Sequence, residues 1–160
     1  MQTVTEYKAP CRKPAPDFRR SVFLAGAIDM GRAVHWQTYV VQRLIAGGHD
    51  VDVFNPRRDD WDSSWVQSID NPQFKEQVDW ELRHLLSSYV VLIYFPKDSQ
   101  APISLLELGL LLGNDARVVV CCEPGFWRRG NIEVLCDRMS TPLHDDLDEA
   151  LIDLESILRA

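Results

Sequence analysis

Two kinds of hydrophobic pattern alternate along this chain. Nearly continuous apolar runs, typical of parallel strands buried on both faces, cover residues 22–28, 51–56, 89–96 and 117–122, with a weaker run at 142–144. Between and after them, apolar residues recur every three to four positions, which is helical spacing, at 34–46, 72–87, 103–113, 131–138 and 146–158. The pattern therefore predicts strands and helices in alternation.

This alternation favours a single α/β domain over residues 21–160, flavodoxin-like or Rossmann-like, in which a parallel five-stranded sheet carries helices on both faces. Residues 1–20 include a Pro-rich stretch at 8–16, and we expect them to form an extended N-terminal arm. Ligands of such folds bind beyond the carboxyl ends of the strands. The segments after the strands are therefore the places to look for a site.

Composition narrows the class of protein. The 160 residues suffice for one domain with a sizeable core, and the net charge of −7 argues against binding to long polyanions. Four cysteines without metal-site spacing or a disulfide framework indicate a reducing compartment. No apolar stretch has the length of a membrane span or the position of a secretory signal. We expect a cytoplasmic protein.

One carboxylate stands in an otherwise apolar helix. Residues 103–113 carry seven Leu or Ile residues, and the spacing predicts a core-facing stripe of Ile103, Leu106 and Leu110. Glu107 falls within the same arc, where a carboxylate is costly unless it is paired, protonated or used in chemistry. The alternative is a solvent-exposed Glu that interacts with the helix dipole.

The segment after the second strand mixes aromatic, charged and amide side chains. Such a mixture suits a planar ligand that forms hydrogen bonds, such as a nucleobase, and the candidates are Asn55, Arg57, Asp60, Trp61, Asp62 and Trp65. A structural loop plug is the alternative. Residues 25–31 lack the G-x-G-x-x-G of dinucleotide-binding domains, so a dinucleotide site is disfavoured.

Three motifs occur in a family-like order: Phe23-Leu-Ala-Gly-Ala27, Glu81-Leu-x-x-Leu-x-x-x-Tyr89 and Ser104-Leu-Leu-Glu-Leu-Gly109. Together they resemble the nucleoside 2-deoxyribosyltransferase family and its relatives, the 2′-deoxynucleoside 5′-monophosphate N-hydrolases. The resemblance covers about residues 21–137. It implies an enzyme that breaks N-glycosidic bonds, with no metal and no cofactor.

The resemblance also assigns roles. Glu107 takes the position of the nucleophile that attacks C1′ of the deoxyribose. The preceding helix places Glu81 where the family has Asp or Asn, Tyr89 replaces a usual Asp, and Asp79 is a rival for the role of Glu81. Asp29, Asp60 or Asp62 could anchor or protonate the base. Gly26, Ile28 and Ser104 are further substrate-binding candidates, and like Asp29 they lie near the ends of predicted strands.

Beyond the fourth predicted strand, Asn131 resembles the family's Asn that reaches a neighbouring subunit's site, so the resemblance implies a homo-oligomer with shared sites. A simple helix N-cap is the alternative for Asn131. Arg128 and Arg129 could clamp a 5′-phosphate or lie on the surface. We thus expect a nucleoside or nucleotide and a free base as partners, deoxyribose transfer as the leading activity, and monophosphate hydrolysis or a silent nucleotide-binding module as alternatives.

Overall fold

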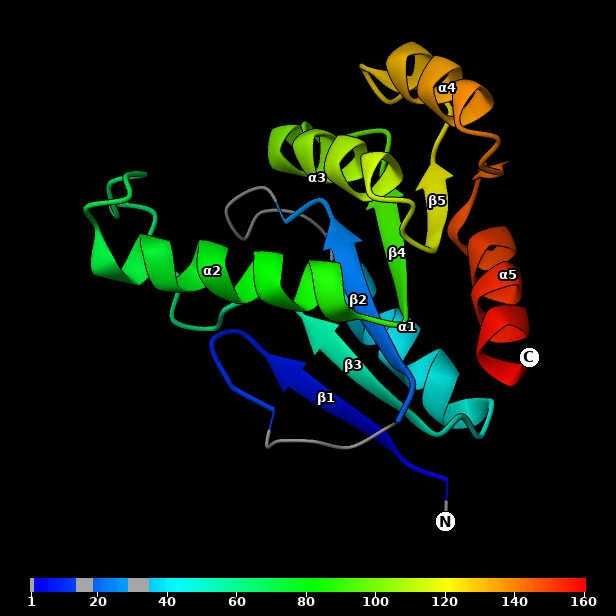
Figure 1. Cartoon of the computed structure of the whole chain (residues 1–160), viewed down its shortest axis with the longest axis horizontal. Helices are drawn as coiled ribbons and strands as arrows, with labels where there is room; N and C mark the ends of the chain where they lie inside the picture. The colour runs from blue at the N-terminus through cyan, green and yellow to red at the C-terminus, as the bar shows by residue number, and fades with distance from the viewer. Residues whose placement is uncertain (1, 14–18, 29–34) are drawn as a thin grey trace.

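The computed structural model describes residues 2–13, 19–28 and 35–160, which form a parallel β-sheet with helices on both faces (Figure 1). The strands are β1 (Val4–Lys8), β2 (Ser21–Gly26), β3 (Val51–Asn55), β4 (Val90–Phe95), β5 (Val118–Cys122) and β6 (Leu143–His144). The helices are α1 (Trp36–Ala46), α2 (Pro72–Ser87), α3 (Pro102–Gly113), α4 (Arg129–Arg138) and α5 (Leu147–Arg159). The predicted fold class is confirmed.

The strand order places a topological switch point in the middle of the sheet. The order is β1-β3-β2-β4-β5-β6, and every pairing is parallel. The chain moves outward from β2 to β3 and then returns to the other side of β2 as β4, so the connections after β2 and β4 leave toward opposite faces. A crevice at that point is the usual ligand site of such sheets.

Two hydrophobic layers hold the helices to the sheet. On one face, α2, α3 and α4 pack on a core that contains Phe23, Ile93 and Phe95. On the other face, α1 and α5 cover a core that contains Leu24 and Leu92. Neighbouring strand residues thus alternate between the two layers, which explains why these strands are apolar at nearly every position.

The sheet has six strands rather than the predicted five, because β1 forms within the stretch that we assigned to the arm. It pairs with β3 from Val4↔Val51 to Lys8↔Asn55. Tyr7 stacks on Phe54 with ring centroids 5.5 Å apart. The strand was not predicted because only two of its five positions, Val4 and Tyr7, are apolar, as is common in an edge strand.

The predicted core-facing stripe of α3 is wrong. Ile103 and Leu106 are 61% and 64% exposed. The buried face instead comprises Ser104, Glu107, Leu108, Leu111 and Leu112. Both faces of this helix are rich in Leu, so hydrophobic spacing does not determine which face turns inward. Glu107 is buried nonetheless, as part of the opposite stripe.

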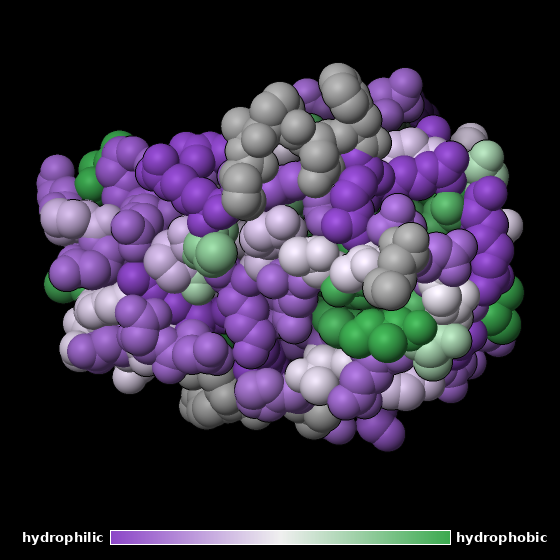
Figure 2. Space-filling model, turned by 90° about the horizontal axis from the view of Figure 1, so that it is seen from below, coloured by the Kyte–Doolittle hydropathy of each residue, from purple (hydrophilic) through white to green (hydrophobic). Residues whose placement is uncertain are grey.

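The exterior is mainly polar. Figure 2 shows one face of the molecule, seen from below, on which hydrophilic residues dominate, with one larger hydrophobic patch and smaller scattered ones. In the part of the chain that the structure describes, no helix has the length and apolar character needed to cross a membrane. Cys121, Cys122 and Cys136 are free and buried, as expected for cysteines that pack as small hydrophobic residues.

Candidate active site

The switch point is formed by a close approach of β2 and β4. Gly26 ends β2 with a φ of 137°, and a Cβ built there would lie 2.3 Å from the carbonyl oxygen of Tyr94. Only glycine tolerates both the dihedral angle and the contact. Ile28, two residues later, is half-buried, whereas Asp29 lies outside the described residues.

Helix α3 delivers Glu107 to this end of the sheet. Ala101 precedes the helix in the left-handed conformation, with φ 44° and ψ 49°, and Pro102 opens the first turn. Ser104 and Glu107 are 4% and 7% exposed. Burial, with a smaller contribution from the charge of Glu81, raises the pKa of Glu107 to about 8. The resting side chain therefore holds a proton at neutral pH.

Glu81 and Asp79 differ in what surrounds them. Glu81 is partly buried, and this burial raises its pKa to about 7. Asp79 is exposed and forms an ion pair with Lys75 one turn earlier on α2. Because the charge of Glu81 acts on Glu107, the structure brings Glu81, and not Asp79, into the environment of the buried carboxylate.

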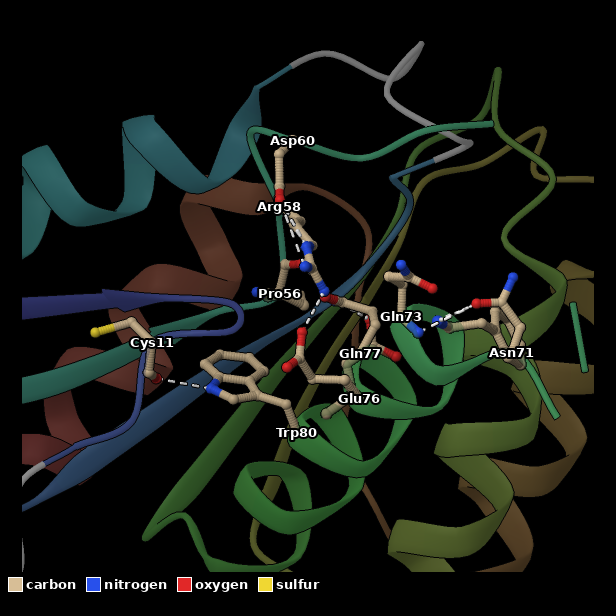
Figure 3. A network of polar contacts seen from close by, with 11 residues as sticks. Cys11, Pro56, Arg58, Asp60, Asn71, Gln73, Glu76, Gln77 and Trp80 are labelled. Atoms are coloured by element: carbon tan, nitrogen blue, oxygen red, sulfur yellow. Dashed lines mark hydrogen bonds and ion pairs between the residues drawn. The ribbon is translucent and has the colours of Figure 1, made fainter. Parts of the chain in front are cut away.

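Gln77 connects Glu81 to the end of β3. Its Nε2 donates to the carbonyl oxygen of Pro56 at 2.9 Å and to Oε1 of Glu81 at 2.8 Å. Figure 3 shows Gln77 directed from α2 toward Pro56. Gln77 was not among the residues predicted from the sequence, although its place four residues before Glu81 on one helix was a usable signal.

The end of β3 is fixed by buried polar side chains. Asn55 accepts from the backbone N–H of Arg57 at 3.0 Å and donates from Nδ2 to Glu6 on β1 at 2.8 Å. Nε of Arg57 donates to Oε1 of Gln37 on α1 at 2.9 Å. Burial lowers the pKa of Arg57. Both predicted candidates therefore lie at the carboxyl end of the sheet, engaged with protein groups.

Arg58 organises the loop between β3 and α2. Its guanidinium pairs with Asp60 at 2.7 Å and with Glu76 of α2 at 3.0 Å (Figure 3). It also lies over the ring of Trp65, 4.9 Å from the centroid, and Trp65 meets Trp61 edge-on at 5.1 Å. The loop is thus an ordered aromatic wall attached to α2. Sequence reasoning missed Arg58, although Asp60 stands two residues away.

Two predicted carboxylates have local partners. Asp60 is held by Arg58, and Asp62 accepts from the backbone N–H and the hydroxyl of Ser64 at 2.9 and 2.7 Å. Both are exposed, and these contacts lower both pKa values. They are therefore charged at neutral pH and are poor proton donors.

The residues after β5 are engaged as well. Arg129 pairs with Glu133 and Asp145, each at 2.7 Å, and donates to the carbonyl oxygen of Cys122. Its guanidinium is thus already used within the protein. Asn131 is exposed in the first turn of α4, and the residue that caps this helix is Arg128.

The carboxyl groups of Glu81 and Glu107 are the part of this site that is suited to acid–base and covalent chemistry. Burial raises the pKa values of both Glu81 and Glu107, and the charge of Glu81 adds to the effect on Glu107. Carboxyl groups with raised pKa values can act as an acid and a nucleophile near neutral pH. Among the described residues, no group of His, Cys, Asp and Glu is placed to hold a metal ion.

Comparison with known proteins connects this geometry to a family. A family model described as nucleoside 2-deoxyribosyltransferase like matches residues 19–126. The crystal structure of a conserved protein from Enterococcus faecalis V583 is similar with a TM-score of 0.50 and 14% identity, over 88% of this chain and 96% of that chain. At this identity the similarity concerns the fold alone. The search of curated proteins found no match.

Proposed function

The chain belongs to the nucleoside 2-deoxyribosyltransferase-like family, and from this premise we propose that it transfers 2-deoxyribose between nucleobases through a covalent intermediate on Glu107. The observation that carries the proposal is the pair of carboxyl groups, Glu81 and Glu107, at the carboxyl end of the sheet. Their pKa values of about 7 and about 8 suit acid–base work near neutral pH.

The first half-reaction uses both carboxyl groups. Glu107 gives up its proton and its carboxylate oxygen attacks C1′, so that an ester bond forms as the bond from C1′ to the base nitrogen breaks. The electron pair of the broken bond stays on the base, which takes a proton from Glu81. Glu81 has received that proton from Glu107, directly or through a water molecule, so the proton count balances.

The second half-reaction restores the free carboxylate. The nitrogen of an incoming base attacks C1′ from the side that the first base left, and the proton of that nitrogen returns to Glu81. Two inversions give retention of configuration, as in retaining glycosidases. If water takes the place of the second base, the same ester is hydrolysed, so exclusion of water decides the outcome. The wall of Trp61 and Trp65 supports transfer.

Hydrolysis of a nucleoside 5′-monophosphate has less support. A phosphate clamp needs guanidinium groups that can turn toward the ligand, and Arg129 already serves Glu133, Asp145 and a backbone carbonyl. Arg128 stacks on the exposed ring of Trp127 at 4.5 Å. Loss of these contacts would be the cost of binding a phosphate here.

We also propose a homo-oligomer. The outer face of α3 exposes Ile103 and Leu106, with Leu110 half-buried beside them, and a helix that is apolar on all sides is normally buried. Contact with a second copy of the chain would cover this face. In such an assembly the exposed Asn131 would be available to a neighbouring site.

The decisive experiment incubates the protein with 2′-deoxyinosine and free adenine, and separately with dAMP, and follows the bases and nucleosides by liquid chromatography. We expect 2′-deoxyadenosine to form, and Glu107→Ala to reduce its formation roughly 10³-fold or more. Asp79→Asn is the matched control, because Asp79 is exposed, and it should retain activity. Release of adenine from dAMP alone would instead favour the hydrolase, and no turnover in either assay would contradict the proposal.

A further inference from the structure

Gln77 is held in one amide orientation by its neighbours. The carbonyl oxygen of Pro56 can only accept a hydrogen bond, so the NH₂ side of the amide must face it. The same NH₂ group also reaches Glu81. If the amide were turned over, two acceptor oxygens would face each other across about 3 Å. The backbone at the end of β3 therefore determines that Glu81 receives an N–H donor.

The orientation leaves an unsatisfied atom behind. Oε1 of Gln77 is buried and has no hydrogen-bond partner among the described residues, and the whole side chain is 4% exposed. An unpaired buried acceptor costs about 1–3 kcal/mol. The fold tolerates that cost because the amide nitrogen serves both the carbonyl oxygen of Pro56 and Glu81.

An N–H donor does not stabilise the two protonation states of Glu81 equally. A hydrogen bond from an amide is stronger to a carboxylate than to a carboxylic acid, so the contact favours the ionised form and opposes the effect of burial. The charge on Glu81 in turn favours a protonated Glu107. One amide group can thus influence which of the two carboxyl groups holds a proton.

We propose that Gln77 is a positioning residue whose N–H donor favours the ionised form of Glu81 in the resting protein and thereby favours a proton on Glu107. This inference rests on the proposed function only for its catalytic consequence. In the resting state the nucleophile is neutral, and the reaction begins when the proton passes from Glu107 to Glu81. The arrangement protects a buried carboxylate from ionising before a substrate is present.

Other charged groups near α2 are directed elsewhere. Glu76 and Asp79, on the same helix, are exposed and paired with Arg58 and Lys75. Lys13 and Arg83 act on His84, one turn further along, and lower its pKa together with burial, which is the larger cause. Among the described residues, Glu81 and Glu107 are therefore the groups whose titration reports on Gln77.

The test is a titration of side-chain carboxyl groups by ¹³C NMR, in the wild-type protein and in Gln77→Met, without substrate. We expect the midpoint of Glu81 to rise by roughly one pH unit, which is the size of one charge-assisted hydrogen bond. The midpoint of Glu107 should fall, because its neighbour is then neutral. Opposite movements separate this role from packing, since loss of packing would admit water and lower both midpoints.

Gln73→Met is the matched control, because Gln73 is exposed one turn earlier on the same helix, and it should leave both midpoints unchanged. If Gln77→Met does not fold, Gln77→Asn decides, since its shorter amide cannot reach both partners and should shift the midpoints in the same directions. Midpoints that stay within about 0.2 units in the variants, or that move together, would overturn the inference.

A kinetic readout adds the catalytic consequence. We expect the pH profile of kcat/KM in Gln77→Met to move toward alkaline pH by about the same amount as the Glu81 midpoint. KM should change less than about twofold, because Gln77 reaches the reaction only through Glu81. Absence of turnover in the wild-type protein would count against the proposed function, whereas the NMR titration needs no substrate and tests Gln77 independently.

Discussion

Replacement of Glu107 by Gln should stabilise the protein at alkaline pH and leave its stability at pH 4 almost unchanged. Glu107 is 7% exposed, and its pKa is raised from 4.5 to about 8. Below pH 4.5 the side chain is protonated in both the folded and the unfolded state. Between pH 4.5 and 8 the folded protein retains a proton that the unfolded chain has released, so the free energy of unfolding falls as pH rises through this window.

The size of the effect follows from the shift. The raised pKa spans about 3.5 units, and one unit corresponds to about 1.4 kcal/mol, which gives a ceiling of about 5 kcal/mol at pH 9. Water that enters around the ionised carboxylate reduces this figure, and we expect a gain of ~2–4 kcal/mol for Glu107→Gln at that pH. At pH 4 the side chain is protonated in both the folded and the unfolded state, and the neutral acid and the amide are nearly isosteric, so the two proteins should differ by less than about 0.5 kcal/mol.

Thermal unfolding at both pH values, followed by circular dichroism, measures this difference. A gain of this size corresponds to an increase in Tm of roughly 5–10 °C at pH 9 for a chain of this length. Asp79→Asn removes an exposed carboxylate and should show no such dependence on pH. An equal effect of Glu107→Gln at pH 4 and pH 9, or destabilisation at pH 9, would refute a buried carboxyl group with a raised pKa.

Three further substitutions test other parts of the structure. Gly26→Ala places a Cβ 2.3 Å from the carbonyl oxygen of Tyr94 at a φ of 137°, and chemical denaturation should show a loss of about 3 kcal/mol or more. Arg58→Ala removes the contacts to Asp60, α2 and Trp65, so hydrogen exchange should become faster in residues 56–70 and hydrolysis should gain relative to transfer. Leu106→Glu puts a charge on the outer face of α3, and light scattering should detect a smaller assembly with unchanged circular dichroism; an unchanged mass would contradict the proposed interface.

The sequence predicted the elements well because their signals are local. The sequence predicted a helix from residue 72, and in the structure α2 begins at Pro72, where Oδ1 of Asn71 accepts from the N–H groups of Gln73 and Phe74 (Figure 3). Which face of α3 packs on the sheet was not predictable from such local signals. With leucines on both faces, the inward side is chosen by the neighbouring sheet, so Ile103 and Leu106 were assigned to the wrong face.

The side-chain partners within the site needed the structure. The sequence did not distinguish Glu81 from Asp79, because that choice depends on which side of α2 meets α3. The loop aromatics and acids were identified as a group, but the ion pair by which Arg58 attaches this loop to Glu76 of α2 joins residues 18 positions apart in the sequence. Such long-range pairs leave no periodic signal in a single chain.

The two outer strands have a consequence for solubility. β1 and β6 flank the sheet, and they cover the hydrogen-bonding edges of β3 and β5. A chain shortened to the family-matched residues 19–126 would lose both of them and would expose two strands whose residues are mostly buried in the full chain. Exposed apolar strand edges pair readily between molecules. The short strands β1 and β6 therefore protect the full chain from aggregation, because they cover the edges of β3 and β5.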